Sequence, residues 1–318
     1  MGRAGAGRKL RRLAAFVVIV LLACVALAVR ARARTAPAIP HGRLGFAWIP
    51  SPALHQLRSA RVYLPPSYAS SPQRRYPTIY LLHGWPGGDG NWSGHGRAAV
   101  TLDTLIARHR IPEVIAVMPN GNGVGLLGRS LYLNSYDGKY RMEDYIVHDV
   151  VTWADSALRT LPDPAHRALI GLSDGGTAAL NLCFKHPDVF GACGGHSGQY
   201  HLKHDSGLRR ILGAEPGARA LLDANSPTVY AARIADQLRH LVIYFDCGRH
   251  DAEARYAVEL DARLDSLAVP HTFHLFPGRH GWGYWKLHLR DSLIAVTRHM
   301  WDTPRAAATP ADTSDGTR

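Results

Sequence analysis

The fold is decided by the stretch Ala168-Leu169-Ile170-Gly171-Leu172-Ser173-Asp174-Gly175-Gly176. A short apolar run leads into the pattern G-x-S-x-G, and a helix-compatible run, 177–185, follows it. This order predicts a strand, a sharp turn with the serine at its tip, and a helix. The turn would lift the Ser173 hydroxyl clear of the sheet and leave backbone N–H groups at a helix N-terminus, where negative charge is favoured. Ser173 is therefore a candidate nucleophile, and a glycine-rich turn with an incidental serine is the alternative.

The rest of the chain alternates between two kinds of run. Strand-like runs lie near 60–64, 78–83, 113–118, 168–172, 190–195, 240–246 and 271–276. Helix-like runs lie near 98–109, 143–160, 175–186, 252–268 and 284–300. Such alternation predicts an α/β domain with a mostly parallel sheet and helices on both faces. The segment 199–239 is longer than a crossover requires, and we expect it to cap the site.

A serine hydroxyl needs a base, and where serine lies on such a turn its acid and histidine partners follow it in the chain. Asp251 lies on a loop after the buried strand 241–245, and His280 follows the last predicted strand. Asp246, at the end of the strand, is the alternative acid, and capping the next helix is the alternative role for Asp251. The other histidines near these runs lack the glycine-flanked loop position: His250, His271, His274 and His288.

An oxyanion needs two N–H donors. One is expected from the backbone of Asp174, directly after the nucleophile. The other is expected from the loop 83–88, because glycines there let the backbone approach a ligand closely. We predict the N–H of Trp85, with Gly84 as the alternative, and Pro86 has no N–H to give.

Together these motifs resemble the esterase D, antigen 85 and feruloyl esterase group of α/β-hydrolases, from about Arg61 to Trp301. The resemblance rests on segments 61–68, 76–88, 118–121, 132–135, 143–147, 171–176, 186–187, 196–198, 247–251 and 277–285. It implies an α/β-hydrolase fold and the hydrolysis of carboxylic esters, or acyl transfer, through an acyl-enzyme. No cofactor or metal is expected.

One residue departs from the pattern of that group, which usually has Met after the nucleophile where this chain has Asp174. The N–H of Asp174 can still serve an oxyanion. A carboxylate facing the site would repel the developing negative charge. We therefore expect the Asp174 side chain to point away from the site or to meet a cation.

Aromatic side chains are expected around the mouth of the site, where they could stack on a sugar or an aromatic acid. They are Trp85, Trp92, Tyr132, Trp282 and Trp285. Core packing is the alternative for each, and it is favoured for Trp285. The candidate substrate-binding residues are Gly84, Tyr132, Asn134 and Trp282.

The net charge of +12 does not indicate a nucleic-acid partner, because the first 34 residues hold 8 of the 37 basic residues and no acidic one. That N-terminus has a basic stretch, an apolar run from Leu13 to Val29, and Ala31-Arg32-Ala33 as a candidate cleavage site. It predicts export with cleavage, or retention as a membrane anchor. Leu21-Leu22-Ala23-Cys24 also resembles a lipoprotein signal, but the apolar residues that follow argue against it.

The expected domains are a signal or anchor segment at 1–34, a linker and N-terminal extension at 35–58, an esterase domain at 59–302, and a disordered tail at 303–318. Three cysteines in the domain, Cys183, Cys193 and Cys247, are expected to be buried thiols, with a Cys183–Cys193 bridge as the alternative. His201 and His204 lack further ligands to complete a metal site.

The sequence therefore predicts an exported serine esterase, periplasmic, secreted or membrane-anchored. Its substrate would be a small-molecule or carbohydrate ester, either an acylated carbohydrate or an aromatic-acid ester. An acyltransferase to a sugar or lipid hydroxyl is the alternative enzyme, and a non-catalytic binding protein on the same fold is the alternative of another class.

Overall fold

The structure is a computed structural model, and it describes residues 18, 21, 39–123, 128–203 and 208–301. The chain divides into two compact units, 1–40 and 41–318. Apart from Val18 and Leu21, the predicted signal or anchor segment lies outside the described residues, and so does the predicted tail at 303–318. Among the described helices, none is long and apolar enough to span a lipid bilayer.

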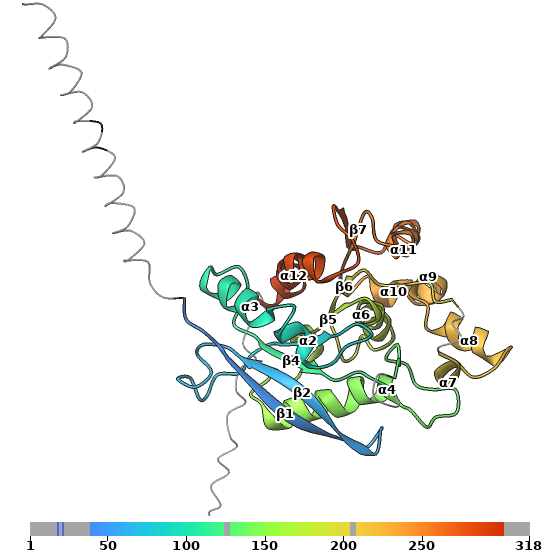
Figure 1. Ribbon diagram of the computed structural model, residues 1–318, viewed down its shortest axis with the longest axis horizontal. Coiled ribbons are helices and arrows are strands. Elements are labelled where there is room, and N and C mark those ends of the chain that lie inside the picture. The colour runs from blue at the N-terminus through green and yellow to red at the C-terminus, as the bar shows by residue number, and fades with distance from the viewer. Residues whose placement is uncertain (1–17, 19–20, 22–38, 124–127, 204–207, 302–318) are drawn as a thin grey trace, which may run out of the picture. The chain divides into compact units, whose positions relative to one another are not determined.

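A sheet of eight strands runs through the second unit, counted over the described residues, in the order β1-β2-β4-β3-β5-β6-β7-β8 (Figure 1). The strands are β1 (Arg43–Ser51), β2 (Gln56–Leu64), β3 (Thr78–Leu82), β4 (Ile115–Pro119), β5 (Arg167–Leu172), β6 (Ala192–His196), β7 (Val242–Gly248) and β8 (Thr272–Phe276). The pairs β1–β2 and β2–β4 are antiparallel, and all the other pairs are parallel. The prediction of a mostly parallel sheet is confirmed.

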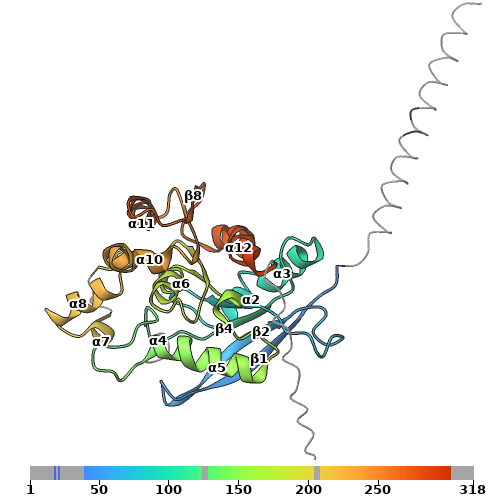
Figure 2. The ribbon, with the colours of Figure 1, turned by 180° about the vertical axis from the view of Figure 1, so that it is seen from behind.

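Helices cover both faces of this sheet, as predicted. One face packs on α3 (Ala98–Ala107) and α12 (Trp282–Thr297), and the other on α5 (Val151–Ala157), α6 (Asp174–Lys185) and α11 (Ala254–Ser266) (Figures 1 and 2). Strand β3 shows why. Its side chains alternate between two apolar clusters: Ile79 and Leu81 pack on the face covered by α3 and α12, whereas Tyr80 and Leu82 pack on the face covered by α5, α6 and α11. A strand buried on both faces must be apolar throughout, which explains its unbroken run of apolar residues.

Short elements complete the layers. They are α2 (Gly90–Ser93), α4 (Met142–Asp144), the π-helical turn η1 (Tyr145–Val150), η2 (Pro164–His166), α7 (Arg209–Leu212), α8 (Gly217–Ala224), α9 (Pro227–Tyr230), η4 (Ala231–Ile234), α10 (Ala235–Leu238) and η5 (Arg298–Trp301). The elements α4, η1 and α5 follow one another without a break, so the helix predicted near 143–160 runs over 142–157.

Strand β1 corrects the expectation of a linker and extension up to residue 58. It pairs along its whole length with β2 in an antiparallel hairpin at the edge of the sheet. The apolar side chains Leu44, Phe46 and Trp48 point to solvent, while Ile49 is buried. Because this edge strand carries apolar residues on both faces, it lacks the alternation that identifies a half-buried strand.

The segment 199–239 folds into α7 to α10 over the described part of that segment. Its apolar side chains Leu202, Ile211 and Leu222 form a third cluster with Leu131 and Leu133 from the loop after β4. The segment expected to cap the site therefore has its own small core, which also packs on the loop after β4.

The three cysteines of the domain confirm the prediction of buried thiols. Cys183, Cys193 and Cys247 are all free and buried, so the alternative of a Cys183–Cys193 bridge is wrong. Burial raises the pKa of the Cys193 and Cys247 thiols, which keeps them protonated. They act as small apolar residues of the core.

Candidate active site

Ser173 lies at the turn between β5 and α6, where the strand, turn and helix were predicted. Its backbone has φ of 53° and ψ of −121°, a conformation that residues other than glycine rarely adopt. Such strained residues cluster at functional sites. The N–H of Ser173 donates to the carbonyl oxygen of His196 at 2.8 Å, which ties the turn to β6.

The tight turn at residues 171–176, which carries Ser173 and is called the elbow below, requires its glycines because the backbone makes close contacts there. A Cβ on Gly171 would lie 1.9 Å from the carbonyl oxygen of Gly175. On Gly175 it would lie 2.4 Å from the carbonyl oxygen of Leu82, and on Gly176 2.6 Å from that of His196. Only glycine leaves room for backbone this close. The pattern G-x-S-x-G-G therefore reflects the sterics of the turn.

The structure brings Ser173, His280 and Asp251 together from three separate loops. The Oγ of Ser173 lies 3.0 Å from Nε2 of His280. On the other side of the ring, Nδ1 lies 2.9 Å and 3.0 Å from the two carboxylate oxygens of Asp251. Asp251 also accepts the N–H of Glu253 at 2.9 Å, at the start of α11. In this arrangement Nδ1–H donates to Asp251, and the Nε2 lone pair faces the Ser173 hydroxyl.

The buried carboxylate and the imidazole shift each other's pKa. Burial alone would raise the pKa of Asp251, but the hydrogen bonds from His280 and from the N–H of Glu253 outweigh it and lower that pKa. Burial alone would lower the pKa of His280, but the hydrogen bond to Asp251 and its charge raise it above the usual value. Asp251 is therefore a carboxylate that stabilises a protonated His280.

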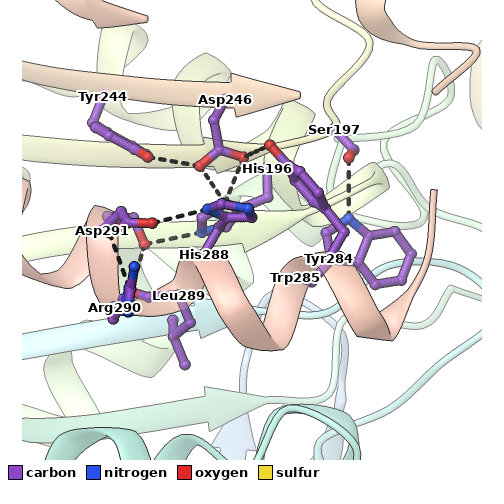
Figure 3. Close-up of polar contacts among 11 residues, drawn as sticks. His196, Ser197, Tyr244, Asp246, Tyr284, Trp285, His288, Leu289, Arg290 and Asp291 are labelled. Carbon is purple, nitrogen blue, oxygen red and sulfur yellow. Dashed lines mark hydrogen bonds and ion pairs between the residues drawn. The ribbon is translucent and has the colours of Figure 1, made fainter. Parts of the chain in front are cut away.

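Asp246, the alternative acid, belongs to a different cluster of polar side chains (Figure 3). Its carboxylate is fully buried and lies 2.9 Å from Nδ1 of His196. The hydroxyls of Tyr244 and Tyr284 donate to it at 2.7 Å and 2.8 Å. The Nε2 of His196 lies 2.9 Å from Oγ of Ser292 on α12. The structure thus pairs each of the two acids with a different histidine.

This second pair lies next to the first. His196 and Asp246 are register partners on the adjacent strands β6 and β7. The next residue, Ser197, donates its N–H to the carbonyl oxygen of Asp246 and accepts the indole N–H of Trp285 at 3.1 Å. The Trp285 ring in turn meets the His280 ring edge-on at 4.9 Å. The sequence carried both His196 and Asp246, but only the strand register shows that they face one another.

The remaining candidate histidines take other partners or positions. Nε2 of His271 bonds to Asp261, and Nδ1 of His288 bonds to Asp291. The ring of His274 packs against Phe276. His250 is exposed.

The loop after β3 packs directly on the elbow. A Cβ on Gly84 would lie 2.9 Å from Cβ of Ser173, so glycine is needed there. The buried ring of His83 donates from Nδ1 to the carbonyl oxygen of Gly84 at 2.8 Å and accepts the N–H of Gly121 at Nε2 at 2.9 Å. Burial lowers the pKa of His83, which agrees with this neutral form. The peptide between Gly84 and Trp85 is trans, so the N–H of Trp85 points in the direction opposite to the carbonyl of Gly84. The hydrogen bond from His83 to that carbonyl therefore also fixes the direction of the Trp85 N–H.

The side chain of Asp174 meets a cation, which is one of the two arrangements expected. Its oxygens accept hydrogen bonds from Nε and from a terminal nitrogen of Arg129, both at 2.7 Å. The guanidinium of Arg129 also lies over the Trp85 ring, 5.8 Å from its centroid. Nothing in the sequence singled out Arg129, because it lies more than forty residues before its partner on an irregular loop.

Of the four predicted substrate-binding residues, two have side chains that hydrogen-bond within the protein. Tyr132 is buried, and its hydroxyl donates to the carbonyl oxygen of His83 at 2.8 Å. The Asn134 amide donates to Asp144 at 3.0 Å, at the end of α4. Both residues hold the loop after β4 in place. Their predicted role in substrate binding remains a prediction.

The aromatic residues near the mouth differ in exposure. Trp282 is half-buried and packs against Trp92 at 5.8 Å and Trp285 at 5.4 Å. Trp85 is 45% exposed. A small pocket beside Trp85 is lined by His83, Gly84, Gly121, Asn122, Gly128, Ser130, Leu131, Tyr132 and Asp174. Trp85 is therefore the aromatic ring of this group that is most open to a ligand.

Within the described ranges there is no group of three or more His, Cys, Asp or Glu side chains placed to hold a metal ion. Nδ1 of His201 bonds to Glu259 at 2.7 Å. His204 lies outside the described residues.

Comparison with known proteins gives the family. The model of the putative esterase family matches residues 51–296, so the chain belongs to that family. An endo-1,4-beta-xylanase/feruloyl esterase of Xylanibacter ruminicola is 30% identical over 173 residues, which cover 52% of this chain and 23% of that protein. An uncharacterized protein of Corynebacterium glutamicum is 26% identical over 246 residues, which cover 76% of this chain and 57% of that protein. The chain thus spans between about a quarter and just over half of these relatives.

Solved structures agree with this family. A ferulic acid esterase superposes with a TM-score of 0.74 at 27% identity, over 81% of this chain and 99% of the other. An S-formylglutathione hydrolase from Agrobacterium tumefaciens superposes with a TM-score of 0.69 at 17% identity, over 83% and 97%, a likeness that shows the fold alone. The chain therefore has the α/β-hydrolase fold, in agreement with its membership of the putative esterase family.

Proposed function

We propose that the chain hydrolyses carboxylic esters through an acyl-enzyme formed on Ser173. The observation that carries the proposal is the unbroken line of hydrogen bonds from Asp251 to His280 and from His280 to Ser173. In this order Ser173 would be the nucleophile, His280 the base that takes its proton, and Asp251 the carboxylate that orients the imidazole.

In the first half of the reaction, Oγ of Ser173 attacks the ester carbonyl while Nε2 of His280 takes the hydroxyl proton. The imidazolium that forms is stabilised by the Asp251 carboxylate, which raises its pKa. Collapse of the tetrahedral intermediate breaks the bond to the alcohol, which leaves with the proton from His280. In the second half, water repeats the attack on the acyl-enzyme, with His280 again as base, and releases the acid.

The former carbonyl oxygen of each tetrahedral intermediate carries a negative charge, and it would accept hydrogen bonds from the backbone N–H groups of Trp85 and Asp174. Asp174 opens α6, a helix of 12 residues, so its N–H lies at the positive end of the helix dipole. The N–H of Trp85 belongs to a peptide whose carbonyl is held by His83. Donors that are fixed before the reaction begins stabilise the oxyanion at little reorganisation cost.

For the substrate we propose an acylated carbohydrate or an ester of an aromatic acid. The exposed ring of Trp85 beside the nucleophile supports this class, because an aromatic face can stack on a sugar or a phenyl ring. The names of two relatives, a feruloyl esterase and a ferulic acid esterase, point to the same class. Transfer of the acyl group to a sugar or lipid hydroxyl would use the same acyl-enzyme with another acceptor.

Purified protein should release p-nitrophenol from short acyl esters, and an organophosphonate should label Ser173. Ser173→Ala should remove both the activity and the label while the melting temperature stays close to that of the wild type. A folded wild type that is neither active nor labelled would refute the mechanism and favour a non-catalytic binding protein.

The substrate class needs a separate experiment. A panel of acetylated sugars, feruloyl esters and short-chain and long-chain alkyl esters compares kcat/KM across the candidates. A strong preference for long acyl chains, with no activity on sugar or feruloyl esters, would refute the proposed class. Added glucose or trehalose tests transfer, since an acylated sugar among the products would identify a transferase.

We propose that the protein is exported, because the basic N-terminus and the apolar run from Leu13 to Val29 have the order of a signal or anchor segment. Fractionation of cells that express the full chain checks this proposal. Activity confined to the cytosolic fraction would contradict it.

A further inference from the structure

Arg129 bridges the two residues whose backbone N–H groups are the expected oxyanion donors. Its guanidinium holds the Asp174 carboxylate by two hydrogen bonds of 2.7 Å and lies over the ring of Trp85. Asp174 belongs to the elbow and Trp85 to the loop after β3, so one side chain from a third loop contacts both walls of the site.

The charge of Asp174 makes this bridge chemically important. The carboxylate follows the nucleophile directly in the chain, and its side chain is only 10% exposed. Water therefore screens it poorly, and a second negative charge forming nearby would be repelled. Burial of Tyr132, and next the charge of Asp174, raise the pKa of the Tyr132 phenol, so the field of this carboxylate reaches the neighbouring loop.

The geometry of the ion pair suits neutralisation. The side-on contact of the guanidinium through Nε and a terminal nitrogen, one bond to each oxygen, is the strong bidentate form of the arginine–carboxylate pair. The Arg129 side chain is 22% exposed, so solvent screens the attraction between the two charges only in part. A lysine would supply the charge without the planar fork.

We propose that Arg129 is a positioning residue of the ester-hydrolysing site, which neutralises Asp174 and holds the two oxyanion donors in register. The proposal rests on the function proposed above. Arg129 acts through Asp174 and Trp85, so its removal affects the charged transition state more than the uncharged ester. The loss should therefore appear in kcat, with KM for a small ester almost unchanged.

The test is a double-substitution cycle on the full chain with p-nitrophenyl acetate. Arg129→Met should lower kcat by about 10- to 100-fold, less than the loss of an oxyanion donor outright. Arg129→Met combined with Asp174→Met should recover most of that loss, because no carboxylate is then left to neutralise. Arg129→Lys should fall between the wild type and Arg129→Met.

A second readout separates this role from simple loss of folding. The groups that act on His280 are Asp251, Glu253 and Asp174, and each raises its pKa against the effect of burial. With Arg129 removed, the uncompensated Asp174 should shift the pH midpoint of kcat/KM upward. In the double variant the midpoint should shift back, since that negative charge is gone. Damage to the fold alone would not produce this pair of opposite shifts.

Arg219→Met is the matched control, because Arg219 also binds an aspartate, Asp223, through Nε, but on the exposed surface of α8. It should leave kcat and the pH midpoint unchanged. Wild-type kcat in Arg129→Met, or a double variant as slow as Arg129→Met alone, would overturn the proposal. Inactive wild-type protein would instead overturn the proposed function, so the two failures are distinguishable.

Discussion

His196 and Asp246 repeat, in the interior, the pairing that His280 and Asp251 make at the candidate active site. In both pairs Nδ1 of the imidazole lies 2.9 Å from a carboxylate oxygen, and Nε2 lies 2.9 Å or 3.0 Å from a serine Oγ. The inner pair is fully buried, whereas His280 is partly exposed. Only the outer pair can therefore meet a substrate, and the inner pair supports the strands on which the site is built.

Asp251→Asn should lower kcat by about 10⁴-fold, because the imidazole loses both its orienting carboxylate and the stabilisation of its charged form. The melting temperature should change little, since the amide can keep the contact with the N–H of Glu253. Steady-state kinetics and thermal unfolding check the two parts. Activity within tenfold of the wild type would exclude Asp251 as the orienting acid.

Asp246→Asn should act on stability. The carboxylate accepts hydrogen bonds from His196, Tyr244 and Tyr284 in a site without solvent. The amide of asparagine accepts fewer hydrogen bonds than the carboxylate, and each buried donor that is left without an acceptor costs about 1–3 kcal/mol. Urea unfolding of the variant measures the loss. A variant with wild-type stability would show that the inner pair does not support the fold.

The pH dependence of kcat/KM follows from the raised pKa of His280. Its neutral form is the base, so activity should rise with pH through a midpoint above the usual histidine value of about 6.5. In Asp251→Asn the charge that raises this pKa is gone and burial remains, so the midpoint of the residual activity should move to lower pH. A midpoint that moves upward or stays in place would contradict the assignment.

Gly84→Ala should damage the site through sterics. The new Cβ would lie 2.7 Å from Cδ1 of Leu172 and 2.9 Å from Cβ of Ser173. Overpacking of this kind costs about 1–3 kcal/mol, and it would push the loop that carries the N–H of Trp85 away from the elbow. Gly88→Ala is the control in the same loop, because a Cβ there meets nothing within 4 Å. Equal activity in the two variants would show that the close approach at Gly84 is not needed.

Sequence patterns predicted the parallel core of the fold, because buried parallel strands are apolar throughout. The need for glycines at fixed places also pointed to Ser173, which the structure brings within hydrogen-bond distance of His280, and His280 in turn within hydrogen-bond distance of Asp251. Strand β1 escaped prediction because its outward side chains Phe46 and Trp48 are as apolar as its inward ones. At such an edge the sequence of β1 does not show which of its side chains are buried, and the strand is identified only by its pairing with β2.

Contacts between distant loops could not be predicted in the same way. The pair of Arg129 and Asp174 joins two segments without regular spacing. The pair of His196 and Asp246 depends on the register of β6 against β7, which no single strand encodes. Sequence could offer a cation for Asp174 as one of two outcomes, but it could not name the residue.

The buried state of Cys183, Cys193 and Cys247 has a consequence for where this domain can fold. Since the described cysteines form no covalent cross-link, the native state of the esterase domain gains nothing from an oxidising environment. Its stability should be the same with and without dithiothreitol, in a compartment of either redox potential. The described domain can thus reach its folded state in a reducing or an oxidising compartment, without the help of a thiol oxidase.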